Sequence, residues 1–257
     1  MTTQAQQLAD WMRERVAAAG SGGIAVGLSG GIDSAVVIAL AAIATPGRVV
    51  GVMMPCHSDP QDEADGRTVA EHFNIPAIRI DLAPAYDRLV ADLTGSLAML
   101  PAEHRLPAAA DPSSTAARLP LANVKPRLRM TSLYFVANSM NYLVAGTGNR
   151  SELAIGYFTK YGDGGVDMLP IGRLLKSEVR TLARELDVPA PIIDKAPSAG
   201  LWLGQTDEAE MGFSYAELET YLTSGAAAVP AELAARIARL ERASDHKRAV
   251  PPLPPAD

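Results

Sequence analysis

A short glycine-rich stretch, Ser29 to Ser34, carries the residue types and spacing best suited to chemistry. It reads S-G-G-I-D-S, follows the apolar segment Ile24–Leu28 and opens a long segment rich in Ala, Val, Ile and Leu. This pattern predicts a buried strand, a tight turn and the start of a helix. The free N–H groups and the dipole of a helix N terminus favour phosphate, and glycine lets the backbone approach such a ligand.

Two better-known phosphate loops do not fit this stretch. A Walker loop requires G-x-x-x-x-G-K-[ST], and a Rossmann loop requires G-x-G-x-x-G; residues 27–34 supply neither. Asp33 stands where the Walker loop has its lysine. Because a carboxylate repels phosphate unless a cation lies between them, Asp33 predicts Mg²⁺ bridging to a polyphosphate. The alternative interpretation is an ordinary strand–helix turn that Asp33 caps.

A second acidic candidate follows another predicted strand, Tyr142–Ala145. The loop after it reads G-T-G-N-R-S-E and ends at Glu152. The carboxyl ends of parallel strands meet at one edge of a sheet, where ligands bind. We therefore expect Glu152 to join Asp33 on the metal, although a solvated glutamate at a helix start is the alternative.

Basic and aromatic residues form further candidate contacts. Residues 123–130 read N-V-K-P-R-L-R-M, in which Arg127 could grip an anion through two hydrogen bonds or belong to a solvated helix face. Residues 156–163 read G-Y-F-T-K-Y-G-D, a composition suited to base stacking and charge contact or to ordinary packing. Lys176 opens a predicted helix against the dipole preference, which indicates an anion nearby.

The order of the predicted elements indicates the fold class. Strands at 24–28, 48–54, 77–82 and 142–145 alternate with helical segments. This alternation predicts an α/β fold with a doubly wound parallel sheet flanked by helices. We expect one domain over residues 1–257, with an extended proline-rich tail at about 249–257. The remaining expected segments are helices at 4–19, 61–73, 84–100, 176–186, 215–222 and 232–243, a helix at 123–139 that starts near Pro126, and a spacer loop or lid at 101–120.

Composition narrows the function classes. The chain has 257 residues, 48% of them hydrophobic, and a net charge of −6, which disfavours general binding of nucleic acid. A single cysteine, Cys56, excludes an intrachain disulfide. The N terminus has no secretion signal, and the longest apolar run is too short to span a bilayer. We therefore expect a cytoplasmic protein without a membrane or nucleic-acid partner.

Taken together, the motifs resemble those of the ammonia-dependent NAD synthetases. This family belongs to the N-type ATP pyrophosphatase superfamily, with the adenine nucleotide alpha hydrolase-like fold. The resemblance covers most of the chain, from about Leu8 to Arg248. In order, the matching segments are S-G-G-I-D-S-A, N-V-K-P-R-L-R-M, G-T-G-N-R-S-E, G-Y-F-T-K-Y-G-D-G, P-S-A-G-L-W-x-G-Q-T-D-E and a terminal H-K-R.

The resemblance implies a set of site residues. The implied ATP site comprises Gly27, Leu28, Ser29, Gly30, Gly31, Ile32, Asp33, Ser34, Thr147, Lys176 and Ser198. Deamido-NAD is implied to contact Arg127, Lys160, Asp167, His246 and Lys247. Asp33 and Glu152 are implied to hold Mg²⁺, and Asp163 and Lys176 to take part in catalysis.

The resemblance also implies the reaction. The carboxylate of nicotinic acid adenine dinucleotide is adenylated by ATP, pyrophosphate leaves, and free ammonia converts the adenylate to NAD and AMP. A homodimer is implied as well, and the helix at 123–139 is its likeliest interface element. The alternatives are another adenylating N-type pyrophosphatase, either GMP-synthetase-like or tRNA-modifying, and a non-catalytic adenine-nucleotide binder.

Overall fold

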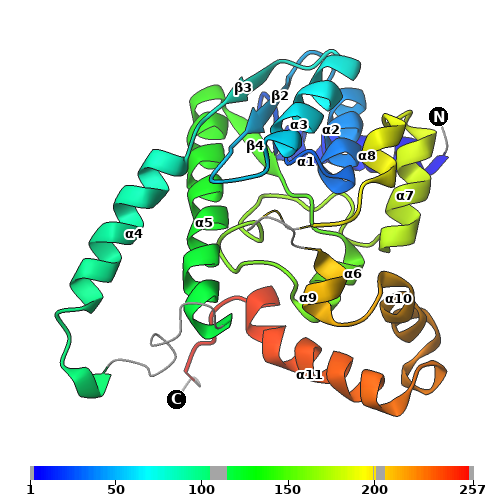
Figure 1. Ribbon diagram of the computed structural model, residues 1–257. Helices are drawn as coiled ribbons and strands as arrows, with labels where there is room; N and C mark the ends of the chain where they lie inside the picture. Colours follow the sequence, from blue (N-terminus) through cyan, green and yellow to red (C-terminus); the bar gives the residue numbers. More distant parts are fainter. Residues whose placement is uncertain (1–2, 105–114, 199, 201–205, 255–257) are drawn as a thin grey trace.

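Four parallel strands form the centre of the molecule, in the order β3–β2–β1–β4. The computed structural model describes residues 3–104, 115–198, 200 and 206–254 (Figure 1). The chain winds from β1 to β3 on one side and returns to place β4 on the other, so the winding direction changes between β1 and β4. This arrangement confirms the predicted doubly wound sheet, and ligands of such sheets bind at the switch point. The strands are β1 (Gly23–Gly27), β2 (Val49–Met53), β3 (Ala77–Arg79) and β4 (Tyr142–Ala145).

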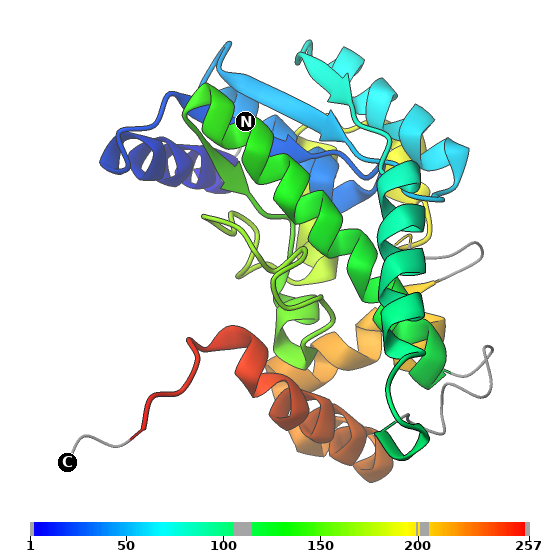
Figure 2. The ribbon, with the colours of Figure 1, turned by 90° about the vertical axis from the view of Figure 1, so that its left-hand side faces the viewer.

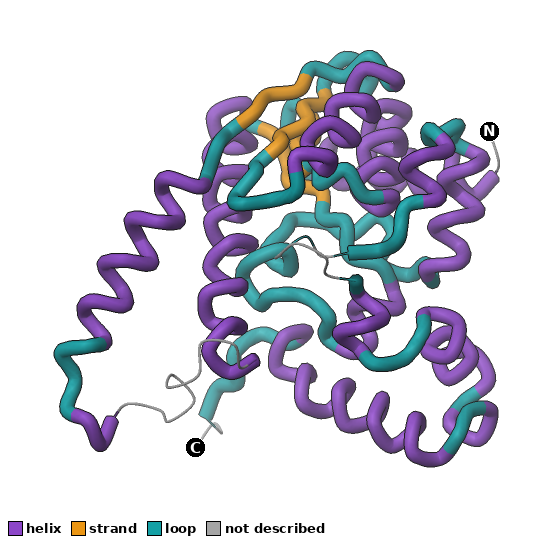
Figure 3. The backbone as a smooth tube through the Cα atoms, in the orientation of Figure 1, coloured by secondary structure: helices purple, strands orange, loops and turns teal. Residues whose placement is uncertain are grey.

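Helices cover both faces of this sheet, as Figure 3 shows. Successive side chains of β1 point to opposite faces: Ile24 and Val26 join the core under α1, α2, α7 and α8, whereas Ala25 packs towards α5. The helices are α1 (Thr3–Ala18), α2 (Ile32–Ala44), α3 (Pro60–His72), α4 (Ala83–Leu97), α5 (Thr115–Met140), α6 (Arg150–Ile155), α7 (Lys176–Glu185), α8 (Ala190–Asp194), α9 (Asp207–Met211), α10 (Tyr215–Ser224) and α11 (Ala231–Arg248).

Helix α5 is longer than the sequence pattern predicts. It begins at Thr115 and contains Pro120 and Pro126, so the expected start near Pro126 is wrong. Each proline removes one backbone donor, but Ala122 and Lys125 between them are buried. Tertiary packing therefore outweighs the local cost of proline in this helix. Figure 2 shows α5 running as one element along the sheet and past it.

Strand β3 is shorter than predicted, and it lies at the edge of the sheet. Regular pairing ends at Arg79, although Ile80 N and Leu82 N still donate to the carbonyl oxygens of Met53 and Pro55, each at 2.9 Å. Of the expected spacer loop at 101–120, residues 105–114 lie outside the described part, and residues 115–120 belong to α5.

A second, smaller core lies beyond the carboxyl end of β4. Ile155 of α6 packs there with Met211 and Phe213, and with Leu218 of α10 and Ile237 of α11. Since α6 starts just after β4, this helical cluster faces the switch point of the sheet. Among the described residues, no helix combines the length and apolar character needed to cross a membrane.

Candidate active site

The loop between β1 and α2 is held by its own serines. Ser34 Oγ donates to Gly31 O at 2.9 Å and lies 3.1 Å from Ser29 Oγ. Gly30 has a φ of +75°, and a Cβ there would lie 2.3 Å from Asp62 O, so only glycine fits. No side chain caps the start of α2. Its first N–H groups are therefore available to an anion, as the phosphate-loop interpretation requires.

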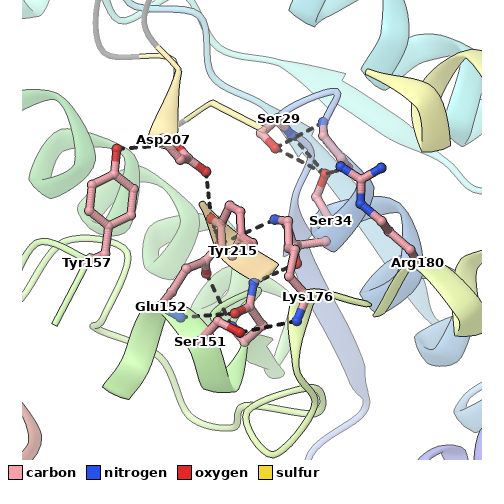
Figure 4. A network of polar contacts seen from close by, with 12 residues as sticks. Ser29, Ser34, Ser151, Glu152, Tyr157, Lys176, Arg180, Asp207 and Tyr215 are labelled. Carbon is pink, nitrogen blue, oxygen red and sulfur yellow. Dashed lines mark hydrogen bonds and ion pairs between the residues drawn. The ribbon is translucent and has the colours of Figure 1, made fainter. Parts of the chain in front are cut away.

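Asp33 lies in the first turn of α2 and meets residues from the start of α6 and from α7. Its Oδ1 accepts a hydrogen bond from Asn149 Nδ2 at 3.0 Å, and its Oδ2 forms a short ion pair with Lys176 Nζ. The same ammonium contacts Glu152 Oε1 at 3.4 Å (Figure 4). The structure thus brings the carboxylates of Asp33 and Glu152 together around the ammonium of Lys176.

A capping box fixes Glu152 and Asn149. Asn149 is the N-cap of α6 and accepts from Glu152 N at 3.0 Å, while Glu152 Oε2 accepts from Asn149 N at 3.2 Å. These reciprocal bonds satisfy helix-end donors and leave Glu152 Oε1 directed at Lys176. The order of residues in G-T-G-N-R-S-E therefore sets the position of the second carboxylate before any ligand binds.

Lys176 is buried at the first position of α7, where a lysine opposes the helix dipole. Burial disfavours its charge, but Asp33 and Glu152 outweigh this effect and raise the pKa of Lys176 above its usual value. Burial, reinforced by the charge of Asp33, raises the pKa of Glu152 to about 8. Two part-buried carboxyl groups therefore share one buried ammonium.

Asp207 is a member of this network that the sequence reasoning missed. It is buried, and it accepts hydrogen bonds from Tyr215 Oη at 2.8 Å and from Tyr157 Oη at 3.2 Å. Tyr215 Oη also donates to Glu152 Oε1 at 3.4 Å, and its ring lies 5.2 Å from Lys176 Nζ. The sequence signal was Thr206, which caps α9, but capping does not reveal where the next carboxylate points.

A cationic cluster lies where the loop 156–165 meets α5 and the end of α11. Lys160 Nζ donates to His246 O at 2.6 Å, and Arg127 donates to Lys160 O at 3.4 Å. Lys247 Nζ donates to the carbonyl oxygens of Gly156 and Phe158, each at 2.7 Å. Among the described residues, none of these three cations has a carboxylate partner. Cationic side chains far apart in sequence therefore meet around one loop without an ion-pair contact to a described carboxylate.

The remaining predicted residues lie outside these contacts. Asp163 accepts from Thr159 N at 2.9 Å within its own loop. Asp167 joins α5 to β4, because it accepts from Tyr134 Oη and from Val144 N, each at 2.8 Å. Ser198 Oγ accepts from Gly200 N at 3.1 Å, and Thr147 is half-buried in the loop after β4. The described contacts do not link these four side chains to Asp33 or to Lys160.

Comparison with known sequences identifies the relatives of the chain. The family model described as NAD synthase matches residues 4–251. The chain is 49% identical to the NH(3)-dependent NAD(+) synthetase of Carboxydothermus hydrogenoformans over 97% of its own length and 96% of the relative's. It is 44% identical to the enzyme of the same name from Syntrophomonas wolfei, over 96% and 93% of the two chains.

Solved structures agree with this relationship. The NMN synthetase of Francisella tularensis superposes with a TM-score of 0.85 and 37% identity over 98% of this chain and 97% of that one. The NH3-dependent NAD synthetase of Campylobacter jejuni gives a TM-score of 0.76 and 27% identity over 99% and 100%. The chain therefore belongs to the NAD synthase family, ligases that complete NAD biosynthesis by ATP-dependent amidation with ammonia.

Proposed function

We propose that the part-buried cluster of Asp33, Glu152 and Lys176 is the centre at which this chain activates a nicotinate carboxylate with ATP. The observation that carries the proposal is the meeting of these side chains beside the uncapped start of α2. Phosphate at a helix N terminus next to a buried ammonium suits the departure of pyrophosphate. The phosphate-contacting segment is residues 27–34, with Thr147, Lys176 and Ser198 as further ATP contacts.

The residues present fit a magnesium ion. Each oxygen of Asp33 and Glu152 retains acceptor capacity beyond its protein contacts, and Lys176 alone does not balance the buried carboxylates. In the described ranges, no group of three or more His, Cys, Asp or Glu side chains could hold a metal ion. Two carboxylates with phosphate oxygens and water are a usual magnesium environment. When bound there, Mg²⁺ would neutralise charge that develops on the phosphates.

The reaction follows from the poor reactivity of a carboxylate with ammonia. A nicotinate carboxylate oxygen attacks the α-phosphorus of ATP, and the bond to the β-phosphate oxygen breaks with release of pyrophosphate. Lys176 and the N–H groups at the start of α2 stabilise the departing charge. Ammonia then attacks the acyl carbon, the bond to AMP breaks, and a proton is lost. Asp163 is the proposed group that orients the ammonia or takes that proton.

The cationic cluster is the proposed binding site of the dinucleotide substrate. Arg127, Lys160 and Lys247 have donors near one another and no described carboxylate partner, which suits a diphosphate. His246 adjoins them through its carbonyl oxygen. Asp167 contributes to the same substrate from the junction of α5 and β4.

A mononucleotide is a second candidate substrate. The solved structure named an NMN synthetase has a higher TM-score and identity with this chain than the NAD synthetase of Campylobacter jejuni. The same adenylation chemistry applied to nicotinic acid mononucleotide would yield NMN. Parallel assays with the two acids separate the candidates, and a larger kcat/KM with the mononucleotide would reverse the assignment to deamido-NAD.

We also propose a homodimer that covers an apolar face of α4 and α5. No side chain of α4 is buried, and Leu89, Leu93 and Leu97 fall at helical spacing on one exposed face. Phe135 of α5 is 74% exposed, which is unusual for an aromatic side chain without a partner. Light scattering after gel filtration is expected to give a dimer mass for the wild type and a monomer mass for Leu93→Glu. A monomeric wild type excludes the dimer.

One assay tests the central proposal. The purified chain is incubated with ATP, Mg²⁺, ammonium chloride and nicotinic acid adenine dinucleotide, and NAD, AMP and pyrophosphate are measured. Equal amounts of the three products are expected, without a requirement for glutamine. The absence of NAD in a folded sample excludes the proposal. The chain is proposed to act as one domain in the cytoplasm.

A further inference from the structure

Arg129 is a part-buried cation that the proposed chemistry does not use. It lies on α5 near the carboxyl end of β2, where its Nε donates to Met54 O at 3.1 Å and its Nη2 to Ser58 Oγ at 3.0 Å. A guanidinium has five N–H donors, so three remain. No described carboxylate lies within ion-pair distance of it. Exposed arginines such as Arg79 and Arg88, by contrast, do have carboxylate partners.

The free part of this guanidinium is reachable by a ligand. In the described part of the chain, no fully buried side-chain nitrogen or oxygen lacks a hydrogen-bond partner. Among the described residues, Arg129 Nη1 has no hydrogen-bond partner, so this nitrogen is not fully enclosed by them. Burial lowers the pKa of Arg129, because removing the guanidinium from water disfavours its charged form. A cation without an ion-pair contact among the described residues, at a ligand-binding edge of a sheet, is a candidate anion site.

A second cation lies one helical turn before Arg129. Lys125 is buried on α5, and its Nζ lies 5.6 Å from the centre of the Tyr86 ring. Residues four apart share a helix face, and like charges at this spacing destabilise a helix. Both cations also act on the same neighbour, since each lowers the pKa of Cys56 against the larger effect of burial. Arg129 and Lys125 therefore lie close to the same neighbour on one face of α5.

Neighbouring acidic residues indicate that Arg129 and Lys125 lie close to the proposed reaction site. Asp62 and Asp163 both exert charge effects on Arg129. Asp62 O is the atom that a Cβ on Gly30 of the phosphate loop would meet at 2.3 Å, and Asp163 belongs to the loop 156–165. Arg129 therefore lies on the side of α5 that faces the phosphate loop and α3, whereas Arg127 reaches Lys160.

We propose that Arg129, supported by Lys125, binds an oxyanion group of one reacting substrate at the carboxyl end of β2. The group is either a phosphate of ATP or the carboxylate of the nicotinate substrate. This inference rests on the proposed function, because it assumes that the reacting groups meet at this edge. Arg129 holds the anion by hydrogen bonds and charge while Met54 and Ser58 hold its other donors.

Calorimetric titration of ATP alone and of nicotinic acid adenine dinucleotide alone identifies the source of the anion. For Arg129→Gln, we expect affinity for one of the two ligands to fall about 10- to 100-fold and affinity for the other to change less than about threefold. A loss for ATP identifies a phosphate, and a loss for the dinucleotide identifies the carboxylate. Arg129→Lys should lose less, because the charge remains. Arg67→Gln, on the exposed face of α3, is the matched control.

A structural role for Arg129 predicts a different result. If the role is structural, Arg129→Gln lowers the melting temperature and weakens the binding of both ligands together. Ser58→Ala, which removes one hydrogen-bond partner of Arg129 but keeps the cation, would then have the same effects. Methylguanidine added to Arg129→Ala should restore the lost affinity only if the guanidinium binds the ligand. Unchanged affinities in folded Arg129→Gln and Arg129→Lys overturn the inference. If the wild type fails to form NAD from ammonia, the proposed function fails instead.

Discussion

The acidic cluster around Lys176 and the cationic cluster around Lys160 use charge in opposite ways. In the first, side chains contact side chains: Lys176 pairs with Asp33 and Glu152, and tyrosine hydroxyls hold Asp207. In the second, Lys160 and Lys247 donate to backbone carbonyl oxygens. The first cluster has more carboxyl groups than cations, and the cations of the second have no ion-pair contact with a described carboxylate. Each lacks what a ligand would supply, a cation with the phosphates in one case and an anionic substrate in the other.

The two clusters also differ in the sequence range of the contacts that position them. The capping box of α6 and the loop serines position Asp33 and Glu152 from short-range contacts. The cationic cluster depends on the approach of α11, at the end of the chain, to the loop 156–165. Backbone carbonyl oxygens are neutral acceptors, so these cations can exchange them for a phosphate oxygen at little cost in hydrogen-bond free energy. We therefore expect changes in the acidic cluster to affect kcat and changes in the cationic cluster to affect KM.

The largest effect is expected from Asp33→Asn. The substitution keeps the shape of the side chain but removes the charge that pairs with Lys176 and is proposed to hold Mg²⁺. We expect kcat to fall about 10³-fold or more, because electrostatic stabilisation of the departing pyrophosphate is lost. Pyrophosphate release is the measurement, with Asp10→Asn in the exposed part of α1 as control. Full turnover in Asp33→Asn would remove Asp33 from the metal site.

Lys176→Met should be nearly as damaging. It removes the only ammonium that contacts Asp33 and Glu152 among the described residues and leaves those carboxylates unpaired. We expect kcat to fall about 10²- to 10³-fold. Lys176→Arg should recover part of the loss if charge is what matters. A loss confined to KM for ATP would instead make Lys176 a binding residue.

Lys247→Gln tests the other half of the comparison. It removes a cation from the proposed binding site of the dinucleotide while leaving the acidic cluster intact. We expect KM for deamido-NAD to rise about 10- to 100-fold, which corresponds to the loss of a charge-assisted hydrogen bond. The kcat should stay within about threefold. Arg242→Gln, in the same helix, is the control. A fall in kcat larger than the rise in KM would contradict the expected assignment of kcat effects to the acidic cluster and KM effects to the cationic cluster.

Tyr215→Phe should have the smallest effect on activity. The hydroxyl bonds both Asp207 and Glu152, so its removal loosens the acidic cluster without removing a charge. We expect about 1–3 kcal/mol of lost stability, since a buried carboxylate loses a donor. Urea unfolding measures the stability, and kcat should fall less than about tenfold. An equal loss in Tyr221→Phe, whose hydroxyl contacts Glu241 in the helical cluster, would show that the effect is not specific to this site.

The sequence pattern predicted most of the fold because its elements have strong local signals. The strand at Tyr142–Ala145 has the predicted bounds, and β1 and β2 lie within a residue of them. The errors occur where packing overrides local preference. Helix α5 extends back to Thr115 through two prolines because Ala122 and Lys125 are buried. The predicted ATP contact of Ser198 remains a prediction, and the nearby residues 201–205 lie outside the described part of the chain.

The candidate site was predictable in part for the same reason. Asp33 and Glu152 follow parallel strands that end at one edge, so their proximity follows from topology. Asp207 comes from a helix far along the chain, and no periodicity indicates that two tyrosines converge on it. Arg129 was visible in the motif around Arg127, but only the structure separates their directions. Residues two apart on a helix point to different faces, and the sequence does not say which face meets the ligand.

By itself, the sequence determined the parallel α/β fold, the glycine-rich turn before α2 and the acidic residues at the strand ends. These depend on hydrophobic periodicity, glycine spacing and helix-start signals, all of which act over short stretches of chain. The tertiary structure alone decided which cation pairs with those carboxylates, which cations have no ion pair among the described residues, and that α11 meets the loop 156–165. Such choices depend on contacts between residues up to 143 positions apart, as for Asp33 and Lys176, and short-range patterns carry no record of them.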